Sequence, residues 1–133
     1  MRRGAGACDG APVQGLRALV ERRWTFRPDA LDRSRGERPL DLITVDEDGL
    51  RLADGAVQVL PVGGIGGEGA LMAWVPAHAL LWAGDYVQSI DGPTLYAGEV
   101  LAAAEREQIR PSHVVAQHLP LTAWSVVEGA NGR

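Results

Sequence analysis

The sequence has little of what marks several classes of protein. It contains 133 residues with a single cysteine, Cys8, and no lysine, so all 13 basic residues are arginines. One cysteine cannot form a disulfide within the chain, and its use fits a reducing compartment. Because Cys8 lies in a Gly/Ala-rich stretch without a neighbouring histidine, we expect an incidental thiol rather than a nucleophile. The formal net charge of -4 offers no basic surface, so we expect no nucleic-acid partner.

Long apolar runs are also missing. The longest, Ala70–Ala83, is interrupted by Pro76 and His78 and is too short to span a bilayer. The first residues include two arginines but no apolar segment after them, which is not typical of a secretory signal. With 46% hydrophobic and 23% charged residues, the composition is that of an ordinary globular chain of one domain at most. We therefore expect a cytoplasmic protein that has no membrane association.

Two parts of the chain differ in their patterning. Residues 1–39 read as a tail, a short amphipathic helix over Pro12–Arg23 and an irregular connection with one helical turn at Asp29–Arg33. From residue 40 to residue 133, short apolar runs alternate with turn residues such as Asp54-Gly55, a strong hairpin signal. The expected strands are 41–45, 50–53, 56–62, 70–75, 79–83 and 113–117, and the expected helices are 95–109, capped by Thr94 and ended by Pro111, and 121–127. This order predicts an α+β fold, a mixed sheet with helices on one face.

The glycine-rich segment VGGIGGEG, residues 62–69, lies between two apolar runs. Gly64, Gly66 and Gly69 match the G-x-G-x-x-G pattern, which binds a dinucleotide only where a strand precedes it and a helix follows it. The run that follows Gly69 is strand-like and is ended by Pro76, so no helix N-terminus is available. We therefore predict no dinucleotide site, although a small ligand-binding α+β domain with this loop at its mouth remains a possible reading.

Two polar side chains follow apolar strands. Asp85 comes after strand 79–83 and Gly84, and His118 follows strand 113–117, with Pro120 expected to stop that strand. Functional groups of such sheets gather outside the carboxyl ends of strands, and a carboxylate beside an imidazole suits a divalent metal such as zinc. On spacing alone, however, a turn-capping aspartate and an ordinary histidine at the boundary explain the pattern better.

Three longer stretches occur in a characteristic order. GLRLADGAVQVLPV predicts a hairpin, ALMAWVPAHALLWAGD a strand pair ending in Gly-Asp, and YAGEVLAAAEREQIRPSHVVAQH a helix, a strand and a final histidine. In this order, Leu50–Trp124 resembles the C-terminal half of a metallo-β-lactamase-fold metallohydrolase, and RPDAL resembles what precedes the hairpin in some members. The resemblance implies half of an αββα sandwich, with a mixed, mostly antiparallel sheet and helices on one face.

The resemblance also implies roles for individual residues. Asp85 would be the ligand that bridges two metals, and His118 would be a terminal ligand of the second metal. The glycine-rich loop aligns with a loop that carries a metal-binding histidine in the family, and Gly66 occupies that histidine's position. Glu68, two residues on, is a tentative third ligand.

Most ligands of the family come from an H-x-H-x-D-H motif that this sequence lacks. His78 is expected to be exposed at a turn. His113 lies five residues before His118 on the same expected strand, so the two should point to opposite faces, and neither His78 nor His113 replaces that motif. A hydrolytic zinc site needs about three protein ligands and a bound water. We therefore expect one weak zinc site at most in the monomer, and no hydrolysis by the chain alone.

Two functions follow from the resemblance. The chain is predicted to be a truncated or degenerate metallo-β-lactamase-fold hydrolase, with metal-dependent hydrolysis of an unknown small-molecule substrate as its ancestral chemistry. The alternative is a non-catalytic interaction module that keeps the half-fold. In both cases half of the sandwich exposes a sheet face, which predicts self-association or a complementary half-domain. Trp74 and Trp82 could contribute to that face, although core packing is the simpler expectation for both.

Overall fold

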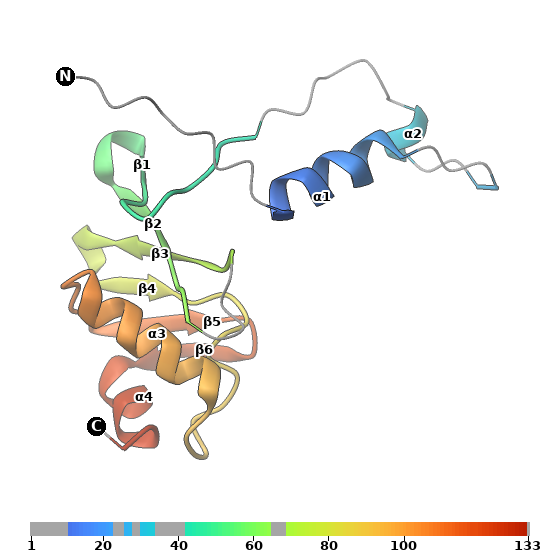
Figure 1. The fold of residues 1–133 in the computed structure, drawn as a ribbon. Helices are drawn as coiled ribbons and strands as arrows, with labels where there is room; N and C mark the ends of the chain where they lie inside the picture. The colour runs from blue at the N-terminus through green and yellow to red at the C-terminus, as the bar shows by residue number, and fades with distance from the viewer. Residues whose placement is uncertain (1–10, 23–25, 28–29, 34–41, 65–68, 133) are drawn as a thin grey trace. The chain divides into compact units, whose positions relative to one another are not determined.

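The computed structural model describes residues 11–22, 26–27, 30–33, 42–64 and 69–132. The chain divides into two units, Met1–Thr44 and Val45–Arg133. The first unit contains helices α1 (Ala11–Glu21) and α2 (Ala30–Arg33), where the sequence predicts a helix and a single helical turn (Figure 1). Within the described ranges, no helix combines the length and the apolar character needed to cross a membrane.

The second unit is built on one six-stranded sheet whose strands lie side by side in chain order (Figure 1). Every neighbouring pair is antiparallel except β4 and β5, which are parallel because the helix α3 (Leu95–Arg106) connects them. This confirms the predicted mixed, mostly antiparallel sheet. The strands are β1 (Leu50–Leu52), β2 (Val57–Pro61), β3 (Leu71–Val75), β4 (Leu80–Trp82), β5 (His113–Ala116) and β6 (Leu119–Ala123).

The turn between β1 and β2 has the conformation that its sequence favours. Ala53, Asp54 and Gly55 have φ of 50°, 54° and 88°, the left-handed values of tight hairpin turns. The strand expected at 41–45 is wrong: residues 42–45 are not in a strand, and residue 41 lies outside the described part. An extended segment becomes a strand only when it finds a ladder partner, and β1 pairs with β2 on its one bonded side.

The C-terminal elements differ from the expectation. Residues 121–123 belong to β6 instead of a helix, and the helix α4 (Trp124–Ala130) begins three residues later than predicted. Pro120 does not end the preceding strand but lies inside β6, after a turn at residues 117 and 118. β6 is an edge strand, where a proline's missing N–H need not break the ladder.

The helix α3 has well-defined caps. At its start, the Thr94 hydroxyl oxygen accepts a hydrogen bond from the N–H of Ala97 at 3.2 Å, as the sequence predicts. At its end, Gln108 has φ of 54°, its N–H donates to the carbonyl of Glu105, and the N–H of Ile109 donates to the carbonyl of Ala104. These two bonds form a Schellman motif, which ends the helix at Arg106, before Pro111 and before the predicted end at residue 109.

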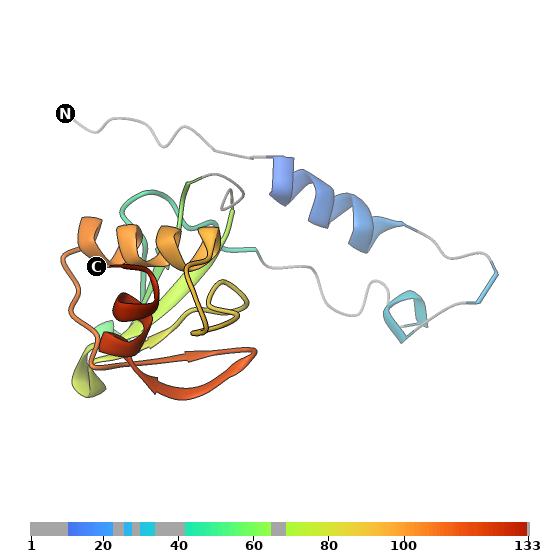
Figure 2. The same ribbon diagram turned by 90° about the horizontal axis from the view of Figure 1, so that it is seen from below.

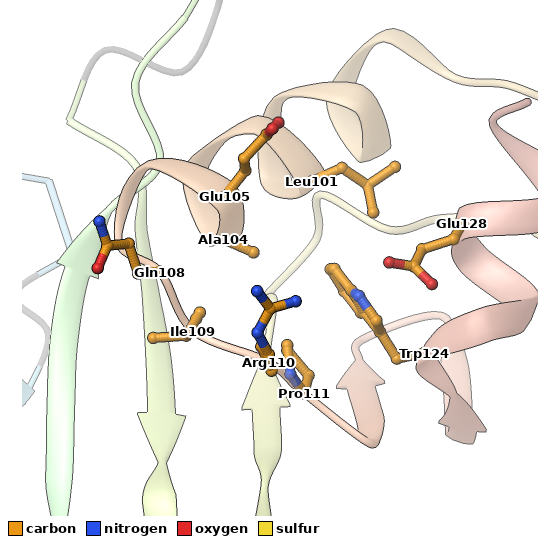
Figure 3. A pocket seen from close by; sticks show the side chains of 9 residues that line it. All are labelled: Leu101, Ala104, Glu105, Gln108, Ile109, Arg110, Pro111, Trp124 and Glu128. Carbon is orange, nitrogen blue, oxygen red and sulfur yellow. The ribbon is translucent and has the colours of Figure 1, made fainter. Parts of the chain in front are cut away.

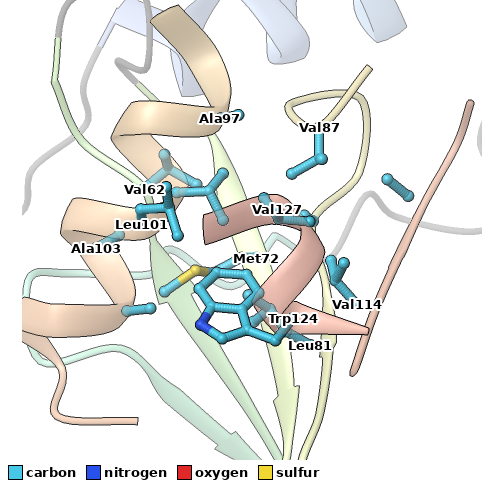
Figure 4. Packing of buried hydrophobic residues seen from close by; sticks show 14 of the residues in the cluster. Val62, Met72, Leu81, Val87, Ala97, Leu101, Ala103, Val114, Trp124 and Val127 are labelled. Carbon is cyan, nitrogen blue, oxygen red and sulfur yellow. The ribbon is translucent and has the colours of Figure 1, made fainter. Parts of the chain in front are cut away.

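One face of the sheet carries the hydrophobic core. The helices α3 and α4 both pack on this side of the strands (Figures 1 and 2). Met72, Leu81 and Val114, on three adjacent strands, are fully buried, and the Trp124 ring packs among them (Figure 4). Trp74 is also part of this core, 8% exposed.

The opposite side of the sheet is also apolar, and we call it the open face. The strand register places Leu50, Val59, Ala73, Trp82 and Val115 in one row across five strands. A second set on the same side consists of Leu52, Val57, Val75, Leu80, His113 and Ala123. Trp82 is 50% exposed here, in contrast to Trp74. Among the described parts of residues 45–132, no helix packs against this face.

Candidate metal centre

The parallel pairing of β4 and β5 determines which residues meet beyond the strand ends. Leu80 pairs with His113, and Trp82 pairs with Val115. The ladder continues past β4, because the N–H of Gln117 donates to the carbonyl of Gly84 at 2.7 Å. Asp85 and His118 are as far apart in the sequence as the two residues of each β4–β5 pair, such as Leu80 and His113. The register therefore brings Asp85 and His118 side by side at the carboxyl edge of the two strands.

The two predicted side chains are in direct contact. His118 Nε2 lies 2.8 Å from Asp85 Oδ1, and the two side chains are 55% and 53% exposed. Gln88, which the sequence analysis did not single out, has its Nε2 3.5 Å from Asp85 Oδ2, a long contact. An exposed pair of this kind contributes at most about 1 kcal/mol to stability.

A glycine turn places Asp85 at this edge. The N–H of Tyr86 donates to the carbonyl of Ala83 at 3.0 Å, which closes a turn around Gly84 and Asp85. Gly84 has φ of 56°, a value that side-chain-bearing residues adopt only at a cost. His118 occupies the matching position in the turn between β5 and β6.

The other histidines are remote from this pair in the fold. His78 is exposed in the short 3-10 helix Pro76–His78, as the sequence predicts. His113 begins β5, at the opposite end of that strand from His118, and its Nδ1 lies 3.0 Å from Ser112 Oγ. Gly66 and Glu68, the loop position that lacks the family's histidine and the tentative third ligand, lie outside the described residues.

The donor atoms of the pair suit zinc, but their number is small. A carboxylate oxygen and an imidazole nitrogen are both common zinc ligands. In the described part of the chain, no group of three or more His, Cys, Asp and Glu side chains is placed to hold a metal. A catalytic zinc site uses three protein ligands and a water, so the described residues by themselves do not form one.

The glycine-rich segment starts with two left-handed glycines. Gly63 and Gly64 have φ of 74° and 79°, and Gly69, after the part that is not described, has φ of 80°. The element that follows is the strand β3, as the sequence predicts, and not the helix whose N-terminus a dinucleotide loop uses.

The helix α3 fixes the start of this segment. Arg106 donates hydrogen bonds to the carbonyls of Pro61 (2.6 Å) and Val62 (3.2 Å), the last residues before the glycines. The Glu99 carboxylate lies directly against Gly64, in space that a β-carbon at residue 64 would need. Arg106 and Glu99 belong to no local motif, so the sequence gives no sign of these contacts.

A separate groove of about 1020 Å³ lies between α3 and α4 (Figure 3). Leu101 and Trp124 contribute apolar surface, and Glu105, Arg110 and Glu128 bring charges of both signs. Neither Asp85 nor His118 lines it, and it contains no histidine or cysteine. The groove is therefore not part of the candidate metal centre.

The sheet and its helix layer define the class of fold. The mixed six-stranded sheet with helices on one face is part of the metallo-β-lactamase fold, as the sequence resemblance predicts. The crystal structure of DIM-1 metallo-β-lactamase matches with a TM-score of 0.50 and 19% identity, over 62% of this chain and 43% of that chain. The structure of TMB-1 matches with a TM-score of 0.52 and 16% identity, over 74% and 49%.

At these identities the likeness establishes the fold and not the activity. The chain spans less than half the length of the two solved structures. No protein-family model matches the sequence, and no curated protein matches it.

Proposed function

We propose that the chain is one half of a metallo-β-lactamase-like metallohydrolase and that Asp85 and His118 form part of its metal site. The observation that carries this proposal is the 2.8 Å contact between His118 Nε2 and Asp85 Oδ1. Two donor types that zinc prefers converge at the carboxyl edge of parallel strands, where ligands of open sheets bind. The fold shared with the two solved structures supports the same reading.

The two side chains would hold one metal ion weakly, because the described residues add no third donor. When bound with a full set of ligands, such a metal supplies an activated water for hydrolysis. In the proposal this chain positions two donors, and another half-fold supplies the rest. The isolated chain is expected to be inactive.

A second candidate is a non-catalytic interaction module, and the open face favours it. Strands whose neighbouring side chains are apolar on both sides are typical of sheets that are covered on both faces. Under this reading the half-fold is kept for assembly, and the contact between Asp85 and His118 is an ordinary exposed ion pair.

Metal content separates the two candidates. We would measure zinc, manganese and iron per chain in the purified protein and in Asp85→Asn and His118→Gln. The matched controls are Asp91→Asn, in the loop after Asp85, and His78→Gln, an exposed histidine elsewhere. The proposal predicts bound metal that both site variants lose and both controls keep. Metal absent from the wild-type chain, or retained by both site variants, would contradict it.

A further inference from the structure

The open face is built for burial. Its central row, Leu50, Val59, Ala73, Trp82 and Val115, crosses five strands without a polar side chain. In the second set His113 alone is polar. Trp82, Leu71 and Leu52 on this side are 50%, 37% and 42% exposed. The largest apolar patch on a protein surface is often an interaction surface.

The edges of the sheet are protected, in contrast to its face. The edge strand β1 has only three residues, and the other edge strand, β6, contains Pro120. Short edge strands and prolines are ways in which proteins prevent pairing between sheet edges. Association through this sheet is therefore expected to occur face to face.

We infer that the open face binds the open face of a second copy of this chain, which deepens the proposed function by naming the other half. The face carries no charged side chain in its rows, so it offers nothing by which charge complementarity could select a different partner. What fits it is a second flat apolar sheet face packed about 10 Å away, and a second copy presents one.

The side-chain sizes suit a two-fold arrangement. Ala73 on β3 pairs with Trp82 on β4, so the smallest and the largest side chains of the central row are neighbours. A two-fold axis that runs along the strands between β3 and β4 places Trp82 of each copy over Ala73 of the other. The large residue of one copy then fills the space above the small one, as facing layers of a sandwich require.

The size of the face sets the strength of the dimer. Six strands about 4.8 Å apart, with about four residues each, cover on the order of 400 Å². Two such faces bury less than the ~1,600 Å² of a standard interface, so the dimer is weak and reversible. We expect a dissociation constant in the micromolar range.

The test is sedimentation equilibrium of the full chain from about 1 to 500 μM. The main variant is Ala73→Arg, which puts a charge at the centre of the open face. Its matched control is Ala102→Arg on the exposed side of α3. Trp82→Thr, a strand-compatible change of a half-exposed side chain, is a second variant in case Ala73→Arg does not fold. Circular dichroism monitors folding of all of them.

The wild-type chain and Ala102→Arg are expected to dimerise with increasing concentration, and Ala73→Arg and Trp82→Thr to raise the dissociation constant at least tenfold. A wild-type chain that stays monomeric at 500 μM would overturn the inference. Binding of an apolar dye to this monomer would then indicate that the open face is left for another partner. Absence of dye binding would indicate that another part of the same chain covers the face. A dimer unaffected by both open-face variants would also overturn it.

This result and the metal measurement fail independently. A monomer that binds metal through Asp85 and His118 would support the proposed metal site and contradict the proposal that a second copy is the other half. A dimer that binds no metal would support the proposed interface and contradict the proposed metal site.

Discussion

The two faces of the sheet carry similar side chains in different surroundings. On the side of α3 and α4, Met72 and Leu81 are fully buried, whereas Trp82, next to Leu81 in the chain, is half exposed on the open face. Alternation along a strand normally separates apolar from polar positions when one face meets water. On β3 and β4 both sets of positions are apolar, which indicates that this part of the sequence is suited to a sheet covered on both faces.

Neighbouring leucines on β4 give the largest expected difference between the faces. Leu81→Ala removes a fully buried side chain and should lower the free energy of unfolding by about 2–5 kcal/mol. Leu80→Ala, at a partly buried position on the open face, should cost less, about 1–2 kcal/mol in the dilute chain. Urea unfolding at low micromolar concentration measures both. Equal losses would show that something already covers the open face in the monomer.

The glycine turn that positions Asp85 should be the next most sensitive place. Gly84→Ala forces a side-chain-bearing residue to φ of 56° and should cost about 1–2 kcal/mol. Thermal unfolding gives the stability change, and metal content shows whether Asp85 has moved. If the variant is as stable as the wild type, the turn between β4 and α3 is not held in this conformation.

Strengthening α3 should stabilise the face that it covers. Gly98 lies inside this helix, and a β-carbon there would meet nothing within 4 Å. Gly98→Ala should therefore raise the free energy of unfolding by about 0.5–1 kcal/mol, because alanine loses less backbone entropy than glycine. The same unfolding experiment compares it with Gly84→Ala. A loss of stability would mean that the helix does not form as described.

The helix end offers a second gain of similar or smaller size. Gln108 is in the left-handed conformation that glycine favours at the residue after a helix. Gln108→Gly should stabilise the fold by about 0.5 kcal/mol, because glycine has no side chain that clashes in the left-handed conformation. The gain is small because glycine also gives the unfolded chain more conformational freedom. A melting temperature below that of the wild type would contradict this account of the Schellman motif.

The smallest effect is expected at the metal centre, which belongs to neither face. Asp85→Asn and His118→Gln should each change the free energy of unfolding by less than about 1 kcal/mol, because both side chains are half exposed. A larger loss in urea unfolding would make the pair a structural element. The pair would then give no support to a binding role.

Much of the sheet could be predicted from local patterns. The Asp54-Gly55 turn, the apolar runs on either side of it and the Thr94 cap are each encoded in a few adjacent residues, and the structure has them. Pro120 misled the analysis because a proline reads as a strand end, yet an edge strand accepts it. The end of α3 was missed since Gln108 occupies a position where glycine is the usual signal.

The candidate site depended on information that a single sequence does not contain. Nothing local to Asp85 or His118 states that β4 and β5 pair in parallel, or in which register, and the register decides that the two side chains meet. The family resemblance supplied that pairing in advance. Arg106 and Glu99, which contact the start of the glycine-rich segment from α3, had no such signal because their partners are far away in the sequence.

If Asp85 and His118 together bind a metal ion, as proposed, the ring signals of the histidines should report the binding. The chain has three histidines, so a nitrogen-15 NMR titration with Zn²⁺ can follow each ring separately. We expect the His118 ring nitrogens to shift first and Asp85→Asn to weaken this response, while His78 and His113 respond only at higher zinc concentrations. A His118 ring that does not respond, or three histidines that respond alike, would contradict it.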